Sequence, residues 1–369
     1  MKISLFVVVL LYGLLGIKSS GHCQALTTND SNRFYFIGGG LTIGYLIPDG
    51  TSLPTISERS PFTLHLDFSM LKNEKAVWDY ANCYIRNGFS LSYVDYGNNQ
   101  ILGKAVNLVI FTEPYLLCSS RWRITLRSGA GFSFLNKIYD ATTNPENIYV
   151  SKHVSHIIML NPTIYYNLSS RLSMQTSVQL SHISNGGIQW PNWGLNNFEI
   201  GIGIEYNLQP QELKKREITP LTDRSWKVIS HAFAGMHNTN PTATSPQEKR
   251  PVAGLNIGIV KPLGKVSSLG VGGEFYYDGA SSVLEVQSGQ QHNSIIGSLS
   301  IQHYFFLGKI AFGQQMAYYV TPNHPNIDTN FYQRYYLEYK LPGPWYVGVS
   351  LRAHGDISDY LTLSTGFIL

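Results

Sequence analysis

Residues 171–184 read RLSMQTSVQLSHIS and alternate strictly between apolar and polar side chains. The even positions are Leu172, Met174, Thr176, Val178, Leu180, His182 and Ser184, whereas every odd position from Ser173 to Ser181 is serine or glutamine. A period of two is that of a β-strand with one apolar and one polar face. Residues 197–208 repeat the pattern, with Phe198, Ile200, Ile202, Ile204, Tyr206 and Leu208 on the even side. We therefore predict two neighbouring strands, and a histidine and a serine end the apolar face of the first.

The rest of the chain divides into similar segments separated by turn signals. Only 14% of the residues are charged, and 24 tyrosines and 34 glycines suit a β-rich chain. We expect strands at 33–47, 62–70, 87–96, 103–117, 121–135, 153–168, 171–184, 197–208, 227–238, 251–262, 267–278, 294–306, 309–320, 330–340, 344–353 and 359–369. Bacterial outer-membrane barrels have an even number of antiparallel strands. The predicted fold is all-β, an antiparallel transmembrane β-barrel of about 14–16 strands.

Linker lengths favour a barrel over a soluble sandwich, which alternation alone does not exclude. With both chain ends periplasmic, linkers after even-numbered strands should be short turns and the others longer. Most linkers follow this rule, but 71–86 and 209–226 are long where short turns are expected. The second of these is rich in charges, so we expect a solvated periplasmic excursion there.

The N-terminus, residues 1–25, reads as a secretory signal peptide. Lys2 precedes the apolar run Leu5–Leu15, and the small residue Ala25 is a plausible cleavage point. The apolar run is shorter than the ~20 residues that a spanning helix needs. The mature chain is then expected to comprise 26–208, which carries the site, the excursion 209–226, and further barrel strands over 227–369. These further strands either widen one barrel or form a second β unit, and we favour one barrel because two walls need two closures.

Two cysteines, Cys83 and Cys118, remain after cleavage and fall on the same, oxidising side of this topology. A disulfide between them and a pair of buried thiols are equally expected.

The strand end carries candidate chemistry. His182 and Ser184 are two apart on a strand, so they point the same way, roughly 7 Å apart along it. An imidazole at hydrogen-bond distance can take the serine proton and make the hydroxyl a nucleophile. A third group should hold the imidazole in the right tautomer, and the turn returns Asn196 to the same face. His-x-Ser alone is a common sequence and carries no weight by itself.

Donors for an oxyanion are also present after the strand. Asn185, Asn192 and the main-chain amides near Gly186 are placed to stabilise negative charge on a reacting carbonyl oxygen. The remaining histidines, His156 among them, show no ligand spacing, and we expect them to be wall or loop residues. The sequence contains no metal motif and no phosphate-binding glycine loop.

The full run from His182 to Asn196, HISNGGIQWPNWGLN, combines His-x-Ser-Asn-Gly with Pro-Asn-x-Gly-x-Asn. It resembles the lipid A 3-O-deacylase (PagL-type), or acyloxyacyl hydrolase, family of outer-membrane barrels. The resemblance implies that His182 is the base and Ser184 the nucleophile, on the lipid-facing outside of an eight-stranded barrel, with Asn192 in the oxyanion site. It is specific over 171–208 and looser over 86–208, so it implies little about 209–369.

One position departs from the family pattern, because Asn196 stands where the family has an orienting glutamate. A neutral asparagine can still accept a hydrogen bond from the imidazole, as in Cys-His-Asn enzymes, but it stabilises the imidazolium less. We expect slower chemistry or a different pH optimum, and Bacteroidetes-like members resemble this chain in carrying asparagine there. Glu199 is no substitute, since its parity puts it on the other face.

The resulting prediction is an outer-membrane serine esterase of a Gram-negative bacterium that hydrolyses an acyl ester of lipid A. Lipid A, or lipopolysaccharide, is the expected partner, and no cofactor is needed because side chains and amides carry the chemistry. The net charge of +4 without a basic stripe argues against nucleic acid. The alternatives are a non-enzymatic channel or structural barrel with a relic motif and, more weakly, a soluble secreted β-sandwich hydrolase.

Overall fold

The computed structural model describes residues 33–47, 58–209, 213, 216–239, 246–283, 289, 291–324, 329–355 and 357–369. The signal peptide predicted at 1–25 lies outside these residues. No helix in the described part of the chain is long and apolar enough to cross a membrane.

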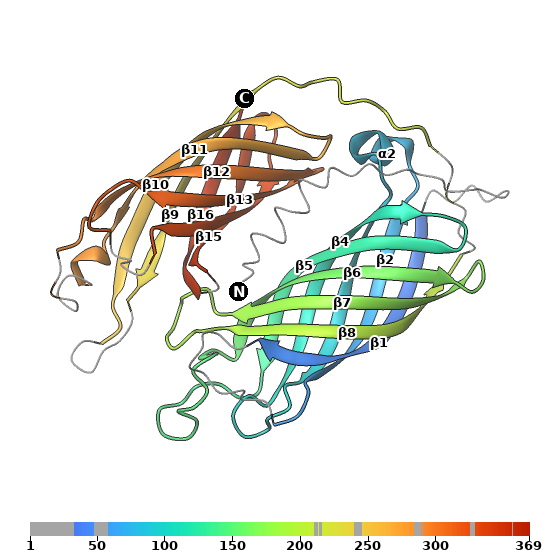
Figure 1. Cartoon of the computed structure of the whole chain (residues 1–369), viewed down its shortest axis with the longest axis horizontal. Helices are drawn as coiled ribbons and strands as arrows, with labels where there is room; N and C mark the ends of the chain where they lie inside the picture. The colour runs from blue at the N-terminus through green and yellow to red at the C-terminus, as the bar shows by residue number, and fades with distance from the viewer. Residues whose placement is uncertain are drawn as a thin grey trace. The chain divides into compact units, whose positions relative to one another are not determined.

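The first eight strands close into one antiparallel barrel (Figure 1). They are β1 (Arg33–Ile47), β2 (Phe62–Lys72), β3 (Ile85–Asp95), β4 (Lys104–Cys118), β5 (Trp122–Leu135), β6 (Val154–Asn167), β7 (Leu172–Ser184) and β8 (Leu195–Asn207), with the short helix α2 (Lys75–Ala81) between β2 and β3. Each strand pairs with the next along the chain, and β1 pairs with β8, from Phe36 opposite Asn207 to Ile47 opposite Asn196.

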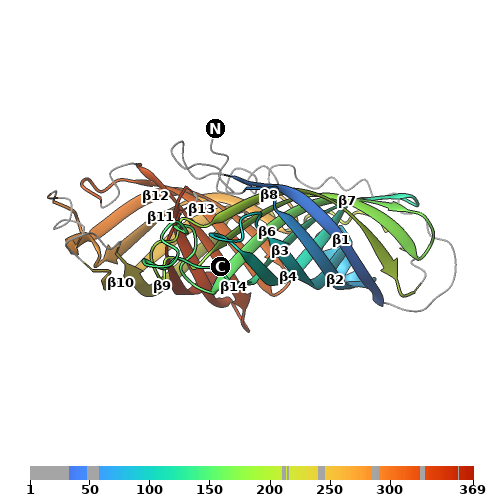
Figure 2. The same cartoon turned by 90° about the horizontal axis from the view of Figure 1, so that it is seen from below.

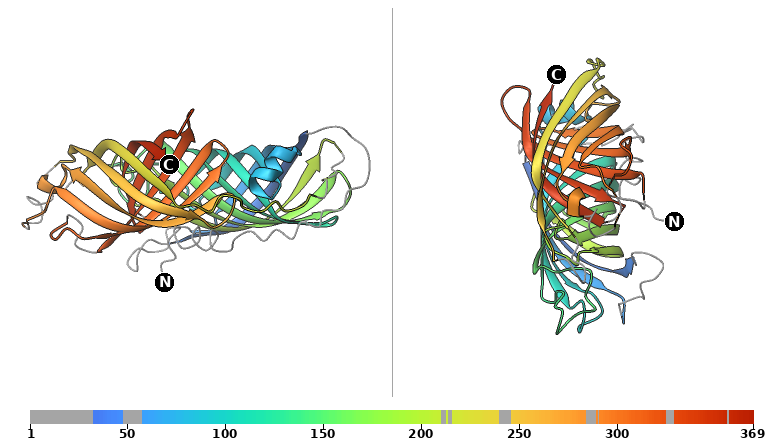
Figure 3. Two further views of the ribbon diagram at one scale, coloured as in Figure 1. Left: turned by 90° about the horizontal axis from the view of Figure 1, so that it is seen from above. Right: turned by 90° about the vertical axis from the view of Figure 1, so that its left-hand side faces the viewer.

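The last eight strands close into a second barrel, whose wall can be followed in Figures 2 and 3. They are β9 (Lys227–Asn238), β10 (Lys249–Pro262), β11 (Ser267–Asp278), β12 (Ile295–Leu307), β13 (Ile310–Tyr319), β14 (Phe331–Lys340), β15 (Trp345–His354) and β16 (Ile357–Ile368). Here β16 pairs with β9 and completes the ring.

The prediction of an antiparallel all-β barrel fold of about 14–16 strands is confirmed. The described residues form sixteen strands, and every strand lies within two residues of its expected bounds. The preference for one barrel is wrong, because β8 returns to β1 and leaves no edge for β9 to join. The sandwich alternative is wrong for the same reason, since each sheet closes on itself. Eight strands are enough to enclose a lumen that side chains can fill. Because each barrel closes on itself, every edge strand is paired.

Both faces of β8 show that this wall is apolar outside and polar inside. Ile200, Ile202 and Ile204 are 55%, 69% and 60% exposed, whereas Glu199 and Glu205 are buried. The alternation predicted from the sequence is thus real, and its apolar side is the outer surface. A closed wall with an apolar exterior is the arrangement of a barrel in a bilayer, where no strand edge meets lipid.

Ion pairs fill the middle of the first lumen. The carboxylate of Glu113 accepts hydrogen bonds from Arg86 at 2.7 Å, Arg127 at 3.1 Å and Tyr165 at 2.9 Å. Glu205 pairs with Arg86 and, at 2.7 Å, with Arg123. All these side chains are buried, so the charges compensate one another in a site that water does not reach.

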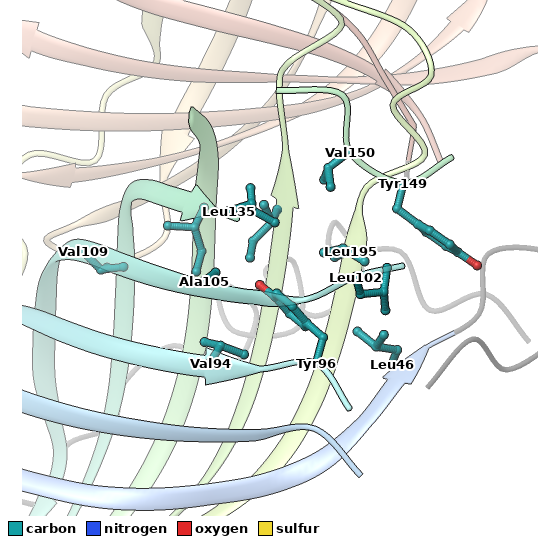
Figure 4. Close-up of a cluster of buried hydrophobic side chains, with 12 residues drawn as sticks. Leu46, Val94, Tyr96, Leu102, Ala105, Val109, Leu135, Tyr149, Val150 and Leu195 are labelled. Carbon is teal, nitrogen blue, oxygen red and sulfur yellow. The ribbon is translucent and has the colours of Figure 1, made fainter. Parts of the chain in front are cut away.

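Apolar side chains close both ends of this lumen. At one end, Leu102, Tyr149 and Val150 from the loops pack beside Leu195 of β8 (Figure 4). At the other end, Trp78 of α2 packs with a cluster that contains Leu213, Phe34, Phe36, Leu71, Tyr84, Tyr115 and Cys118. The lumen is therefore sealed by hydrophobic contacts above and below its ion pairs.

The segment after β8 belongs to the second of these seals. Leu213 is buried, the indole of Trp78 donates to the carbonyl of Glu217 at 2.8 Å, and Asn82 and Thr219 hydrogen-bond to each other. The expectation of a periplasmic excursion over 209–226 stays a prediction: Leu213 is buried, whereas most of the residues from Glu217 to Trp226 are exposed.

The two cysteines are buried thiols within the described residues and are not joined by a disulfide. Burial also raises the pKa of the Cys83 thiol to about 12, so this group is protonated and unreactive at neutral pH. Of the two equal expectations, the structure matches the pair of buried thiols.

Aromatic and charged side chains fill the second lumen as well. Arg334 donates to both oxygens of Glu274, at 2.9 and 2.8 Å, and His231 lies 3.1 Å from Glu338. The phenol rings of Tyr276, Tyr332, Tyr336 and Tyr360 are buried among them. This barrel is likewise packed with side chains.

Candidate functional site

Cross-strand pairing brings His182 and Asn196 together. The two residues lie directly opposite each other in the β7–β8 ladder, because the turn between the strands returns the chain with matching parity. Nδ1 of His182 lies 2.7 Å from Oδ1 of Asn196. An N–H at Nδ1 that donates to this oxygen leaves Nε2 as the basic nitrogen of a neutral imidazole.

Ser184 is the last residue of β7 and has the same parity as His182. The outward face of β7 is exposed at Met174, whereas His182 is half-buried and Ser184 is buried. At the end of β7, where the strand gives way to the loop, the predicted base is therefore half-buried and the predicted nucleophile is buried.

Buried side chains on the inner face of β7 and β8 anchor the site. Ile183 and Leu195 have the opposite parity, are fully buried, and belong to the apolar cluster that seals this end of the lumen. Because successive side chains on a strand point to opposite faces, packing of Ile183 holds its neighbours His182 and Ser184 outward. The role of Ile183 was not predicted, although an apolar side chain at the end of a polar face was a usable signal.

A glycine that the sequence analysis did not single out sets the position of the imidazole. Gly194 has a φ of +80°, and a Cβ built there would stand 2.5 Å from Cε1 of His182. Its N–H donates to the carbonyl of Tyr149 at 2.9 Å. A side chain at this position would meet both backbone strain and the ring of the predicted base.

We expect Gly194→Ala to lower the rate of ester hydrolysis about 100-fold, because a displacement of about 1 Å at a reacting group costs that much. The kcat of the purified protein in detergent micelles measures it. Gly308→Ala is the matched control, since Gly308 has a φ of +69° but its Cβ would meet nothing within 4 Å. Equal rates for both variants would contradict a role of Gly194 in placing His182.

The predicted oxyanion donors make contacts that the sequence did not indicate. The side-chain amide of Asn185 donates to Oγ of Ser151 at 3.0 Å, and Gly186 has a φ of +69°. Residues 186–192 belong to the same compact unit as the second barrel, and within it the amide of Asn192 donates to Oγ of Ser358 at 3.2 Å. The roles of Asn185, Gly186 and Asn192 as oxyanion donors stay predictions.

Within the described part of the chain, no three His, Cys, Asp or Glu side chains gather closely enough to hold a metal ion.

Two family models match the chain, one over each barrel. Residues 62–205 match the model described as lipid A 3-O-deacylase (PagL), and residues 225–369 match the acyloxyacyl hydrolase C-terminal domain. The second match covers a region about which the sequence resemblance implied little. His182, Ser184 and Asn196 all lie inside the first match.

Solved structures give a more distant likeness. The crystal structure of the outer membrane enzyme PagL is 10% identical, covers 45% of this chain and 97% of its own, and has a TM-score of 0.32. A mutant of Rh. blastica porin is 12% identical, covers 91% of this chain and 99% of its own, and has a TM-score of 0.20. No curated protein sequence matches the chain.

Proposed function

Because the chain belongs to the lipid A 3-O-deacylase (PagL) and acyloxyacyl hydrolase family of outer-membrane barrels, we propose that it is a serine esterase that removes an acyl chain from lipid A. The contact that carries the proposal is the 2.7 Å pair of His182 and Asn196, two residues from Ser184 on the outward face. A base with a fixed tautomer beside a hydroxyl is the minimum that a serine hydrolase needs.

In the proposed reaction, Oγ of Ser184 attacks the ester carbonyl while its proton moves to Nε2 of His182. The new C–O bond gives a tetrahedral intermediate, which expels the sugar alkoxide, and His182 returns the proton to that oxygen. Water then attacks the acyl-serine with the same histidine as base, releasing a fatty acid and the free hydroxyl of Ser184. Asn196 keeps the imidazole oriented through both halves.

Charge that develops on the carbonyl oxygen requires donors, and each well-placed donor contributes about 3–4 kcal/mol to transition-state stabilisation. We assign this role to the amides of Asn192 and Asn185 with the main-chain N–H near Gly186. The neutral Asn196 offsets less of the imidazolium charge than a carboxylate would, so the turnover number should be modest for a serine esterase.

The substrate follows from where the site faces. Ser184 and His182 end a strip of exposed apolar side chains, so a molecule that reaches them lies in the leaflet with its polar head at the rim. Lipid A, the acylated anchor of lipopolysaccharide, has this form and is what the family acts on. The chain belongs in the outer membrane of a Gram-negative bacterium, where that lipid is found.

Packing of the lumen favours the esterase over the alternative of a channel. The buried ion pairs of Glu113 and the apolar clusters at both ends occupy the space that a conducting pore would need. An eight-stranded barrel is just wide enough for side chains to fill it.

The direct test is mass spectrometry of lipid A from Gram-negative cells with and without the full chain. We expect a lipid A species lighter by one acyl chain, with the matching fatty acid released, only in cells that make the protein. Unchanged lipid A from cells with folded protein in the outer membrane would overturn the esterase. Stepwise conductance in planar bilayers would then favour the channel.

A further inference from the structure

A second imidazole lies beside the predicted nucleophile. His156 is on β6, directly opposite Ser184 in the β6–β7 ladder. Residues opposite each other in an antiparallel pair have Cβ atoms about 4.5–5.5 Å apart. Ser184 thus has one imidazole two residues back on its own strand and another on the neighbouring strand.

The His156 ring is on the outer surface of the barrel. It is exposed, and on its other side it contacts the exposed ring of Phe132 of β5, with ring centroids 5.7 Å apart and planes at 41°. The ring of Phe132 therefore packs beside the imidazole, which has no part in the proposed reaction.

An imidazole on this surface needs an explanation, because its outward neighbours are apolar. Val154 precedes it and Ile158 follows it on the same face, and Phe134 lies opposite Val154. A polar group in contact with lipid is unfavourable unless it finds a polar partner. Since β6 begins at Val154, His156 lies near the end of the strand, and the exposed Lys152 comes just before the strand.

We propose that His156 is a substrate-positioning residue that binds a phosphate group on the headgroup of the glycolipid whose ester reaches Ser184; this inference rests on the proposed function. A phosphate oxygen accepts a hydrogen bond from a ring N–H of histidine. The two histidines then have separate tasks: His182, held by Asn196, moves the proton, and His156 holds the headgroup so that the ester carbonyl faces Oγ of Ser184.

The test compares phosphorylated lipid A with enzymatically dephosphorylated lipid A as substrates of the purified full chain. We expect His156→Gln to lower the ratio of kcat/KM for phosphorylated over dephosphorylated lipid A about tenfold, mainly through KM, because one hydrogen bond to the headgroup is lost. His156→Lys again presents N–H donors and should restore most of the ratio. Inorganic phosphate at the same concentration as the lipid should not inhibit hydrolysis, because the proposed site binds phosphate only as part of a headgroup that its acyl chains hold at the site.

His153→Gln is the matched control. It removes an imidazole from an exposed residue three positions away, but the Nδ1 of that ring lies 2.7 Å from the carbonyl oxygen of Leu135, and it should leave the substrate ratio at the wild-type value. An equal loss on both lipids in His156→Gln would overturn the proposal, as would the same change of ratio in His153→Gln.

Failure of the proposed function gives a different result. If the wild-type chain hydrolyses neither lipid, binding of the two lipids in micelles, followed by tryptophan fluorescence, still decides the inference. We then expect tighter binding of the phosphorylated lipid by wild type and His156→Lys than by His156→Gln. Equal affinities in all three would reject the headgroup site.

Discussion

Ser184→Ala should fold as the wild-type barrel does and lose lipid A deacylation, with a fall in kcat of at least about 10³-fold. The hydroxyl is the only group of the protein that forms a covalent bond to the acyl carbon in the proposed reaction. His182→Asn should lose a similar factor, because neither intermediate can form without a base to take the proton. Release of fatty acid from lipid A in detergent micelles measures both variants.

The effects of Ser184→Ala and His182→Asn should not add, since the two groups act in the same step. Folding is monitored separately by the shift in electrophoretic mobility of the unheated protein. Substitution of the outward Met174 by alanine is a suitable control, because this exposed side chain lies on β7 away from the strand end. Full deacylation by either Ser184→Ala or His182→Asn would end the assignment of the site.

Glu113→Gln should lower the free energy of unfolding of the first barrel by about 3–5 kcal/mol, the cost of removing one partner from a buried ion pair. The amide keeps the shape of the side chain but removes one of two carboxylates from each buried guanidinium, which leaves Arg127 with Asp67 alone and Arg86 with Glu205 alone. Urea unfolding of the protein in detergent, followed by electrophoretic mobility, gives the midpoint.

The control for this change is Glu146→Gln, which removes the same charge from an exposed loop residue. Its effect should stay within about 0.5 kcal/mol, as is usual for surface substitutions. If Glu113→Gln unfolds at the same urea concentration as this control, the ion pairs of the lumen contribute no stability.

Local patterns in the sequence were sufficient to predict the strands. Residues 267–278 and 227–238 have the same bounds in prediction and structure, because alternation and turn residues act over a few positions. The pairing of His182 with Asn196 was also predictable, since the parity of a strand and its return after a turn follow from counting residues. These features depend on neighbours along the chain.

Closure and loop packing were not predictable in this way. The same alternation fits one ring of sixteen strands or two of eight, and only the pairing of β1 with β8, residues far apart in the chain, decides between them. Contacts of Gly194 with His182, and of His156 with Ser184, depend on loop conformation and cross-strand register. A glycine in a Pro-Asn-x-Gly-x-Asn run was the one signal that a positive φ was needed there.

The pairing of β1 with β8 and of β9 with β16 also bears on biogenesis. A polypeptide that forms two self-contained rings can be inserted into the membrane in two rounds, with each ring completed from its own consecutive hairpins. A damaged strand in one ring then leaves the hydrogen bonding of the other intact. Gain or loss of a whole ring is accordingly a modular step in evolution, which a single wide wall would not permit.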